Sequence, residues 1–336
     1  MPSDWTVLAT ASTIEGVGQA SAESLLAAGC EIRLPDTFQA HPAAKLQPLL
    51  TGVQAVYAGV DEFSADVLSS EEACDLQIIS RWGVGYDRID VAAATELGIV
   101  IAYTPGLLDE AVADYTFALL LGVARRIHSG YLSMAEGGWT QQWGHDVHRK
   151  TLGLVGCGRI GLAVARRAAG FNMRLLASDP HPNEDARALG VEFVSLETLL
   201  EQSHFVSLHA AVTPETEGLI SAPQLDRMRP DSYLINAGRG ALVNETDLAA
   251  CLNAGRIAGA AVDTYQIEPL PTGHPLRSAT NLLMSPHQAS FAAETGQQVS
   301  RTCAQAILDL KTGQRPELVL NPEVFDSDRL RARMSV

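Results

Sequence analysis

The stretch that decides the fold is "TLGLVGCGRIGLAVARRAAGF", residues 151–171. An apolar run, TLGLV, leads into three glycines at Gly156, Gly158 and Gly161, and a helix-forming segment follows. The next apolar run ends at Asp179, 18 residues after Gly161. A strand, a glycine turn, a helix and an acidic residue after the second strand together form the fingerprint of a dinucleotide-binding βαβ unit.

Each residue of this fingerprint has a physical task. Gly156 allows the tight turn, Gly158 lets the backbone approach a pyrophosphate, and Gly161 lets the helix pack on the strand. The helix N-terminus attracts the anion. Asp179 would accept hydrogen bonds from ribose hydroxyls and repel a 2′-phosphate, so the stretch predicts NAD (NADH) rather than NADP. A turn that binds nothing is the minority interpretation, because four spaced features must coincide.

Short apolar runs alternate with helix-length segments on both sides of this stretch. The runs are TVLAT, EIRLP, QAVYAG, LQIIS and GIVIAY before it, and MRLLASD, HFVSLHA, SYLINAG, IAGAAVD and NLLMSPH after it. Strands that are apolar throughout indicate parallel sheets covered on both faces. We therefore expect an α/β protein with two doubly wound units, joined by one long helical stretch over residues 107–139. A last helix, at about residues 292–313, fits either unit.

Composition excludes several classes of function. The 336 residues carry a formal net charge of −15, which opposes nucleic-acid binding. The N-terminus has no basic leader and the most apolar helical run is too short to span a bilayer, so we expect neither export nor membrane insertion. Five cysteines at irregular spacing predict a reduced, cytoplasmic protein, and no cluster has metal-ligand spacing, so we expect no metal.

Three side chains that can carry out chemistry follow three successive late strands. Arg239 comes after SYLIN, Glu268 after IAGAAVD and His287 after NLLMS. Ligands of open α/β sheets bind outside the carboxyl ends of the strands. Each residue alone is more simply a surface arginine, a solvated acid or an ordinary histidine. Together they supply a cation for a 2-oxo acid, an acid/base for the alcohol proton, and a carboxylate that keeps the histidine protonated.

At this point the sequence resembles a known family, the D-isomer-specific 2-hydroxyacid dehydrogenases. The resemblance covers nearly the whole chain, through SRWGVGYDRID, GCGRIG, TPETEGLI, MRPDSYLINAGRG, AAVDTYQIEPL and SPHQAS. The ordered set is specific although single motifs are not. Two departures stand out. Arg88 replaces the usual Asn after GVGYD, and the last motif ends in HQAS instead of the commoner glycine-containing form.

The resemblance implies a role for each matched residue. Arg239 binds substrate, His287 is the acid/base and Glu268 is its partner. The backbone of Val84 and Gly85 holds the substrate carboxylate. The cofactor residues are Gly156, Gly158, Arg159, Ile160, Gly161, Asp179, Thr213, Ala237 and, at the nicotinamide amide, Asp263. Arg81 matches an arginine of phosphoglycerate-type members, and an anion-binding and a structural role for it are about equally favoured.

The resemblance also implies the domain order. A Rossmann NAD-binding domain at residues 102–289 is inserted into a flavodoxin-like substrate domain at residues 1–101 and 290–336, and the protein forms a homodimer through the NAD-binding domain. The implied function is NAD-dependent interconversion of a small D-2-hydroxy acid and its 2-oxo acid. Two alternatives stay open: a D-3-phosphoglycerate dehydrogenase without a regulatory domain, and a non-catalytic NAD-sensing protein on the same scaffold.

Overall fold

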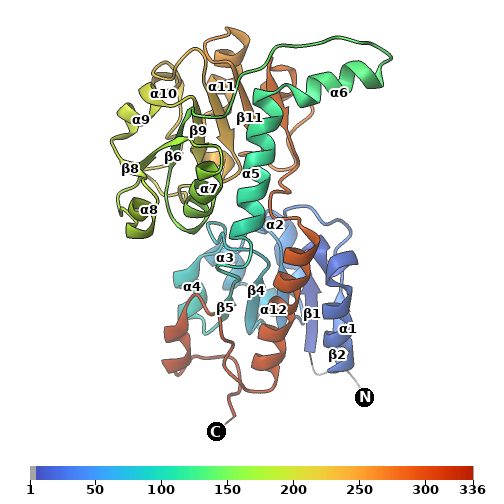
Figure 1. The fold of residues 1–336 in the computed structure, drawn as a ribbon. Helices are drawn as coiled ribbons and strands as arrows, with labels where there is room; N and C mark the ends of the chain where they lie inside the picture. Colours follow the sequence, from blue (N-terminus) through green and yellow to red (C-terminus); the bar gives the residue numbers. More distant parts are fainter. Residues whose placement is uncertain (1–4, 336) are drawn as a thin grey trace. The chain divides into compact units, whose positions relative to one another are not determined.

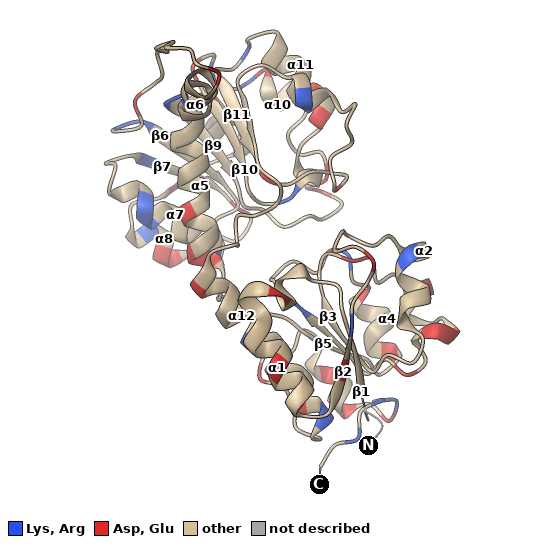
Figure 2. Cartoon of the chain, turned by 90° about the vertical axis from the view of Figure 1, so that its right-hand side faces the viewer, with Lys and Arg blue, Asp and Glu red and all other residues tan. Residues whose placement is uncertain are grey.

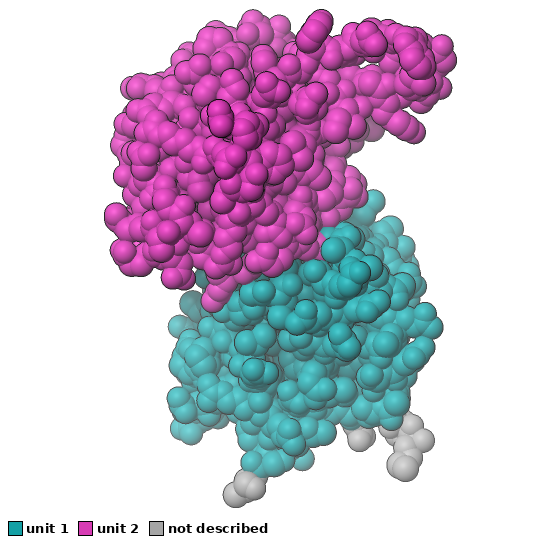
Figure 3. Space-filling model, in the orientation of Figure 1, with its two compact units in different colours: residues 1–108, 291–336 teal, residues 109–290 magenta. Residues whose placement is uncertain are grey.

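The computed structural model describes residues 5–335. The chain divides into two compact units, Met1–Leu108 with Phe291–Val336, and Asp109–Ser290 (Figure 3). The first unit is thus built from both ends of the sequence and the second from its middle. The functional domain boundaries expected from the sequence, after residues 101 and 289, stay a prediction beside this division.

The first unit contains a five-stranded parallel sheet in the order β2-β1-β3-β4-β5. Its strands are β1 (Trp5–Ala9), β2 (Cys30–Arg33), β3 (Ala55–Ala58), β4 (Ile78–Arg81) and β5 (Val100–Ala102). The strand order reverses between β1 and β3, as in flavodoxin-like folds. The expected doubly wound, flavodoxin-like sheet is confirmed.

Neighbouring residues of these strands are buried on opposite faces of the sheet. Val7 and Tyr57 pack under α1 (Gln19–Ala27) and α12 (Ala293–Lys311), which lie side by side (Figures 1 and 2). Leu8 and Val56 belong to a second core cluster on the other face. The shorter helices are α2 (Ala43–Leu46), α3 (Ala65–Leu68) and α4 (Val91–Glu96). Burial on both faces explains why these strands read as continuous apolar runs.

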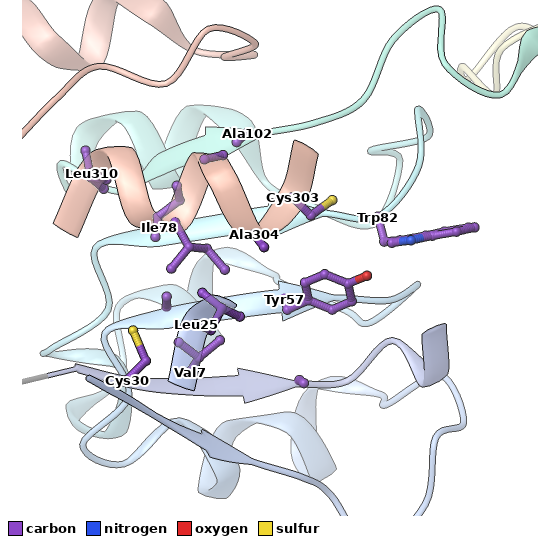
Figure 4. Packing of buried hydrophobic residues seen from close by; sticks show 14 of the residues in the cluster. Val7, Leu25, Cys30, Tyr57, Ile78, Trp82, Ala102, Cys303, Ala304 and Leu310 are labelled. Carbon is purple, nitrogen blue, oxygen red and sulfur yellow. The ribbon is translucent and has the colours of Figure 1, made fainter. Parts of the chain in front are cut away.

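Helix α12 covers one face of the first unit's sheet. Cys303, Ala304 and Leu310 pack against the sheet in Figure 4. The hydroxyl of Ser300, on the same helix, accepts hydrogen bonds from Tyr57 Oη at 2.9 Å and Trp82 Nε1 at 3.0 Å. The C-terminal helix is therefore an integral part of the unit that begins at the N-terminus.

The second unit contains a seven-stranded parallel sheet in the order β12-β11-β10-β9-β6-β7-β8. Its strands are β6 (Thr151–Val155), β7 (Arg174–Ser178), β8 (Glu192–Phe193), β9 (Phe205–Leu208), β10 (Tyr233–Asn236), β11 (Gly259–Val262) and β12 (Leu282–Met284). The order extends the Rossmann arrangement by one strand, with its reversal between β6 and β9. Every strand expected from the sequence is present, and the two-residue β8 was not expected.

The helical stretch after the first unit is two helices, which corrects the expectation of one. Helix α5 (Asp109–Ala124) packs on β10 and β11, and α6 (Ile127–Ala135) follows it. Arg126 between them adopts φ 52°, a left-handed conformation that a continuous helix does not allow. The other helices of the unit are α7 (Arg159–Ala169), α8 (Glu184–Ala188), α9 (Leu196–Gln202), α10 (Ala222–Leu225) and α11 (Glu245–Asn253). In Figure 1, α6 extends away from the sheet of its unit.

The charged residues are dispersed over both units. Basic positions are interspersed with acidic ones in the view of Figure 2, in keeping with 24 Lys and Arg against 39 Asp and Glu. Within residues 5–335, no helix has the length and apolar character needed to cross a membrane.

Candidate active site

The glycine turn has the shape that a bound dinucleotide requires. Gly156 adopts φ +87°, and a Cβ there would lie 2.5 Å from the backbone nitrogen of Ala210. A Cβ on Gly161 would lie 2.5 Å from the Gly156 carbonyl oxygen. A Cβ on Gly158, in contrast, would meet no described atom within 4 Å. Two glycines therefore permit close packing, and the third leaves open space where a pyrophosphate can approach the backbone.

Asp179 lies beside this turn, at the end of β7. Its Oδ2 accepts the backbone N–H of Cys157 at 2.7 Å, and its Oδ1 accepts the N–H of His181 at 2.8 Å. These two bonds fix the carboxylate next to the first residues of the turn. Burial, and secondarily the Asp179 charge, raise the pKa of the Cys157 thiol to about 11, so the thiol remains neutral.

The remaining cofactor residues expected from the sequence lie in the same unit. Arg159 and Ile160 are the first residues of α7, where backbone N–H groups are available to an anion. Thr213 is exposed after β9, and its N–H donates to Thr216 Oγ1 at 2.8 Å. Ala237 is buried directly after β10.

The three candidate catalytic residues follow three adjacent strands, β10, β11 and β12. Because the strands are parallel, their carboxyl ends share one edge of the sheet. His287 Nδ1 lies 2.7 Å from Glu268 Oε2. The other carboxylate oxygen of Glu268 accepts the backbone N–H of Tyr265 at 2.9 Å. The imidazole is 32% exposed and the carboxylate 18%, so both are reachable but held in place.

Arg239 lies in a turn that packs tightly against the segment carrying Glu268. A Cβ on Gly240 would lie 2.0 Å from the carbonyl carbon of Tyr265, so only glycine permits this approach. The side chain of Asn236 bridges the turn, because its amide donates to the Arg239 carbonyl at 2.9 Å and its oxygen accepts the Gly238 N–H at 3.1 Å. Arg239 Nη1 donates to the Gly238 carbonyl at 2.9 Å.

Asp263 organises the segment that carries His287. Its buried carboxylate accepts the Ser285 hydroxyl at 2.6 Å and the backbone N–H groups of Gln288 at 3.0 Å and Ala289 at 2.8 Å. Its carbonyl accepts the His287 N–H at 2.7 Å, while His287 adopts φ 53°. These bonds hold a left-handed histidine backbone that would otherwise be unfavourable. The nicotinamide contact expected for Asp263 stays a prediction.

Sequence reasoning missed the supporting contacts around these residues. Tyr265 Oη donates to the Ser285 carbonyl at 2.9 Å and joins the segments that carry Glu268 and His287. Asn236 ends a strand and looks like any strand-terminating polar residue. The only available signal was that polar residues directly follow apolar runs at this edge.

In the first unit, Val84 and Gly85 lie in the loop that follows β4. Arg81 is buried, and its guanidinium donates to two carbonyl groups of this loop. One is the carbonyl of Trp82, and the other is that of Gly85, which lies 3.0 Å from Nε. Thr104 secures the same loop, since its Oγ1 accepts the Gly83 N–H at 3.1 Å. These contacts hold the loop on two sides.

The surroundings of His209, which follows β9, indicate a structural role. Its Nε2 lies 2.8 Å from Ser207 Oγ, and burial lowers the pKa of its imidazole to about 4. A neutral ring fits a packing role. Over residues 5–335, the structure contains no group of three or more His, Cys, Asp or Glu side chains placed to hold a metal.

Comparison with known proteins assigns the chain to a family. Residues 117–289 match the model of the D-isomer specific 2-hydroxyacid dehydrogenase, NAD binding domain. A glyoxylate reductase of Korarchaeum cryptofilum is 44% identical over 271 residues, which are 79% of this chain and 81% of that protein. Glyoxylate/hydroxypyruvate reductase B of Escherichia coli is 36% identical over 307 residues, 88% of this chain and 95% of that protein.

A solved structure agrees with these sequence matches. The apo D-lactate dehydrogenase of Escherichia coli is 30% identical and superposes with a TM-score of 0.80, covering 94% of this chain and 99% of that one. The cofactor expected from the glycine turn is confirmed as NAD(H) by the family model. The chain belongs to the D-isomer-specific 2-hydroxyacid dehydrogenases and is an NAD-dependent oxidoreductase that interconverts 2-hydroxy and 2-oxo acids.

Proposed function

We propose that this enzyme reduces a small, unphosphorylated 2-oxo acid of the glyoxylate or hydroxypyruvate type to the corresponding 2-hydroxy acid, which has the D configuration where the new centre is chiral. The observation that carries the proposal is the His287–Glu268 pair, 2.7 Å apart, at the same sheet edge as the Arg239 turn. The names of the relatives from Korarchaeum cryptofilum and Escherichia coli support the substrate class.

The geometry supports a distinct role for each residue of the trio. With Nδ1 committed to Glu268, the Nε2 of His287 is the ring atom left to protonate the oxygen that becomes the alcohol. Glu268 fixes the ring orientation, because its carboxylate accepts a hydrogen bond from Nδ1. Arg239 binds the substrate carboxylate and polarises its carbonyl. NADH, when bound, supplies the hydride that reaches the substrate carbon.

The residues around the glycine turn hold the cofactor in this proposal. Arg159 and Ile160 present backbone N–H groups to the pyrophosphate, and Asp179 accepts bonds from the adenosine ribose. Thr213, Ala237 and Asp263 contact the rest of the dinucleotide. Because the Asp179 carboxylate is fixed beside the turn, a 2′-phosphate would meet a negative charge, which favours NADH over NADPH.

In the first unit, the backbone N–H groups of Val84 and Gly85 bind the substrate carboxylate. The contacts of Arg81 with its own loop support a role in shaping that loop. Direct binding of a second substrate anion by Arg81 stays a prediction, and it is the feature that a phosphorylated substrate would need. Turnover of phosphohydroxypyruvate in preference to hydroxypyruvate would favour the phosphoglycerate dehydrogenase alternative.

We propose a homodimer formed through the NAD-binding domain. No residue of α6 is buried, and the helix and the segment after it expose large apolar side chains. These are Ile127, Tyr131, Leu132, Met134, Trp139 and Trp143, of which Trp143 is 97% exposed. In Figure 3 this part of the second unit projects as an arm. Apolar side chains in such number on one projecting element favour burial against a second copy.

The oligomer is tested by sedimentation. We expect the sedimentation equilibrium mass of the wild type to be twice the chain mass and that of a Tyr131→Glu, Trp143→Glu variant to equal it. A wild-type monomer at micromolar concentration would contradict the dimer.

The five cysteines are free, which supports a cytoplasmic location.

The activity is tested with a panel of glyoxylate, hydroxypyruvate, pyruvate and phosphohydroxypyruvate, followed by NADH oxidation. We expect the highest kcat/KM with glyoxylate or hydroxypyruvate. Absence of turnover with every 2-oxo acid, despite NADH binding, would favour the NAD-sensing alternative instead.

A further inference from the structure

A second carboxylate–imidazole pair lies behind the segment that carries Glu268. Glu245 is the first residue of α11, and it is 5% exposed. Its Oε2 lies 3.2 Å from His274 Nε2. Neither residue was singled out by the sequence, and neither has a part in the chemistry described above.

Glu245 is attached directly to the catalytic segment. Its Oε1 accepts the backbone N–H of Gln266 at 2.8 Å, and the side chain of Gln266 donates to the Val243 carbonyl at 2.9 Å. Gln266 lies between Tyr265, whose N–H donates to Glu268, and Glu268 itself. A shift of the Gln266 peptide would therefore move both ends of the hydrogen bond that orients the Glu268 carboxylate.

The hydrogen bonds of His274 indicate which of its ring nitrogens donates to Glu245. Nδ1 accepts the Leu276 N–H at 3.4 Å, at the start of the short 3-10 helix Pro275–Ser278. A ring that accepts at Nδ1 carries its proton on Nε2, which donates to Glu245. Glu245 therefore accepts a hydrogen bond from His274 Nε2 on one side of the segment, whereas Glu268 contacts His287 on the substrate side.

The surroundings of the Glu245 carboxylate act on its pKa in opposite directions. Burial raises its pKa above the ordinary value, and the nearby charge of Glu268 raises it further. The Gln266 N–H and His274 favour the ionised form. Tyr265, whose own pKa is raised chiefly by burial, lies within the reach of the same charges. Glu245 and Glu268 therefore interact electrostatically across the segment that joins them.

We propose that Glu245, held by His274, is a positioning residue for the acid/base pair, an inference that rests on the proposed role of His287. Its carboxylate fixes the 264–268 segment so that Glu268 meets His287. Its negative charge also acts on Glu268, the carboxylate that contacts His287. The two contributions separate experimentally, because one depends on hydrogen-bond reach and the other on charge.

Three variants of the full-length enzyme test this. Glu245→Gln keeps an oxygen that can accept the Gln266 N–H but removes the charge, and Glu245→Asp keeps the charge but shortens the reach. Asp247→Asn is the matched control, because Asp247 lies in the same first turn of α11 and accepts the Ala222 N–H at 2.9 Å. For each variant, the ring signal of His287 is titrated by NMR and assigned with His287→Gln.

We expect Glu245→Gln to move the His287 titration, and the alkaline limb of kcat/KM for reduction, to lower pH by roughly half a unit, because a nearby negative charge is lost. We expect Glu245→Asp to lower kcat roughly ten- to a hundredfold without that shift, since displacements of about 1 Å can cost this much. The dissociation constant of NADH should stay within about twofold in both. Asp247→Asn should change neither readout.

The wild-type results separate this inference from the proposed function. If no 2-oxo acid is reduced, the proposed function fails, while the His287 titration still decides whether Glu245 acts on it. If Glu245→Gln and Asp247→Asn give the same titration and the same kcat as wild type, the inference is wrong. Should Glu245→Gln not fold, His274→Ala takes its place, with the same expected direction, because loss of the Nε2 donor promotes protonation of Glu245.

Discussion

Gly158→Ala tests whether the glycine turn is shaped by its own packing or by a ligand. Gly158 has φ −73° and ψ −154°, an extended conformation outside the left-handed region, and its added Cβ would meet no described atom within 4 Å. The folded protein should therefore accept the methyl group. We expect the free energy of unfolding to stay the same or rise by about 0.4–1 kcal/mol, because alanine restricts the unfolded chain.

The same methyl group would occupy the space through which a pyrophosphate approaches the backbone. Charge-assisted hydrogen bonds contribute roughly 1.5–3 kcal/mol each, so stretching one or two of them should weaken NADH binding by about ten- to a hundredfold. Binding is measured by titration of NADH fluorescence, and unfolding by urea denaturation without cofactor. The decisive quantity is the combination of unchanged stability with lost affinity.

Gly161→Ala is the matched control within the same turn. Its Cβ would lie 2.5 Å from the Gly156 carbonyl oxygen, so the helix must move off the strand. We expect a loss of stability of about 1–3 kcal/mol. If Gly158→Ala binds NADH as tightly as wild type, or unfolds as readily as Gly161→Ala, the turn does not hold the cofactor in the way described.

Three further outcomes follow from the site and its surroundings. His287→Ala should lower kcat by about 10²–10⁴-fold, the usual contribution of a positioned acid/base, and normal turnover would remove it from the mechanism. Arg81→Ala should reduce activity on hydroxypyruvate and phosphohydroxypyruvate alike if the arginine only shapes its loop, whereas a selective loss on the phosphorylated substrate would show direct anion binding. The pKa of His209 is lowered to about 4, so its contribution makes the protein less stable as the pH falls from about 6.5 to 4. His209→Gln should therefore reduce the loss of unfolding free energy over this pH range, measured by urea denaturation, by at most about 3 kcal/mol.

The sequence predicts the fold well, for an identifiable reason. Parallel strands buried on both faces are continuous apolar runs, so the placement of Arg239, Glu268 and His287 after three adjacent strands could be predicted from the strand ends. Their chemical roles stay a prediction. The break between helices α5 and α6 at Arg126 could not be predicted, because arginine is a good helix former and only its left-handed backbone ends the helix.

The supporting contacts were beyond sequence reasoning because they join residues far apart in the chain. Glu245 contacts Gln266 and His274, on the segment that follows β11, and Trp82 shares the Ser300 hydroxyl with Tyr57. Each partner taken singly resembles an ordinary polar residue. Their roles emerge only when strand pairing and helix packing place them together.

The shared core of the N-terminal strands and helix α12 has a consequence for biosynthesis. Strands β1, β3, β4 and β5 emerge from the ribosome before residues 109–290, whereas the helix that covers one of their faces emerges after them. During translation the central unit can fold as a whole, but the sheet face of the N-terminal segment that α12 covers stays exposed until α12 has been synthesised. We therefore expect nascent chains that end shortly before Ala293 to be the form of this protein most dependent on chaperones and most prone to aggregation.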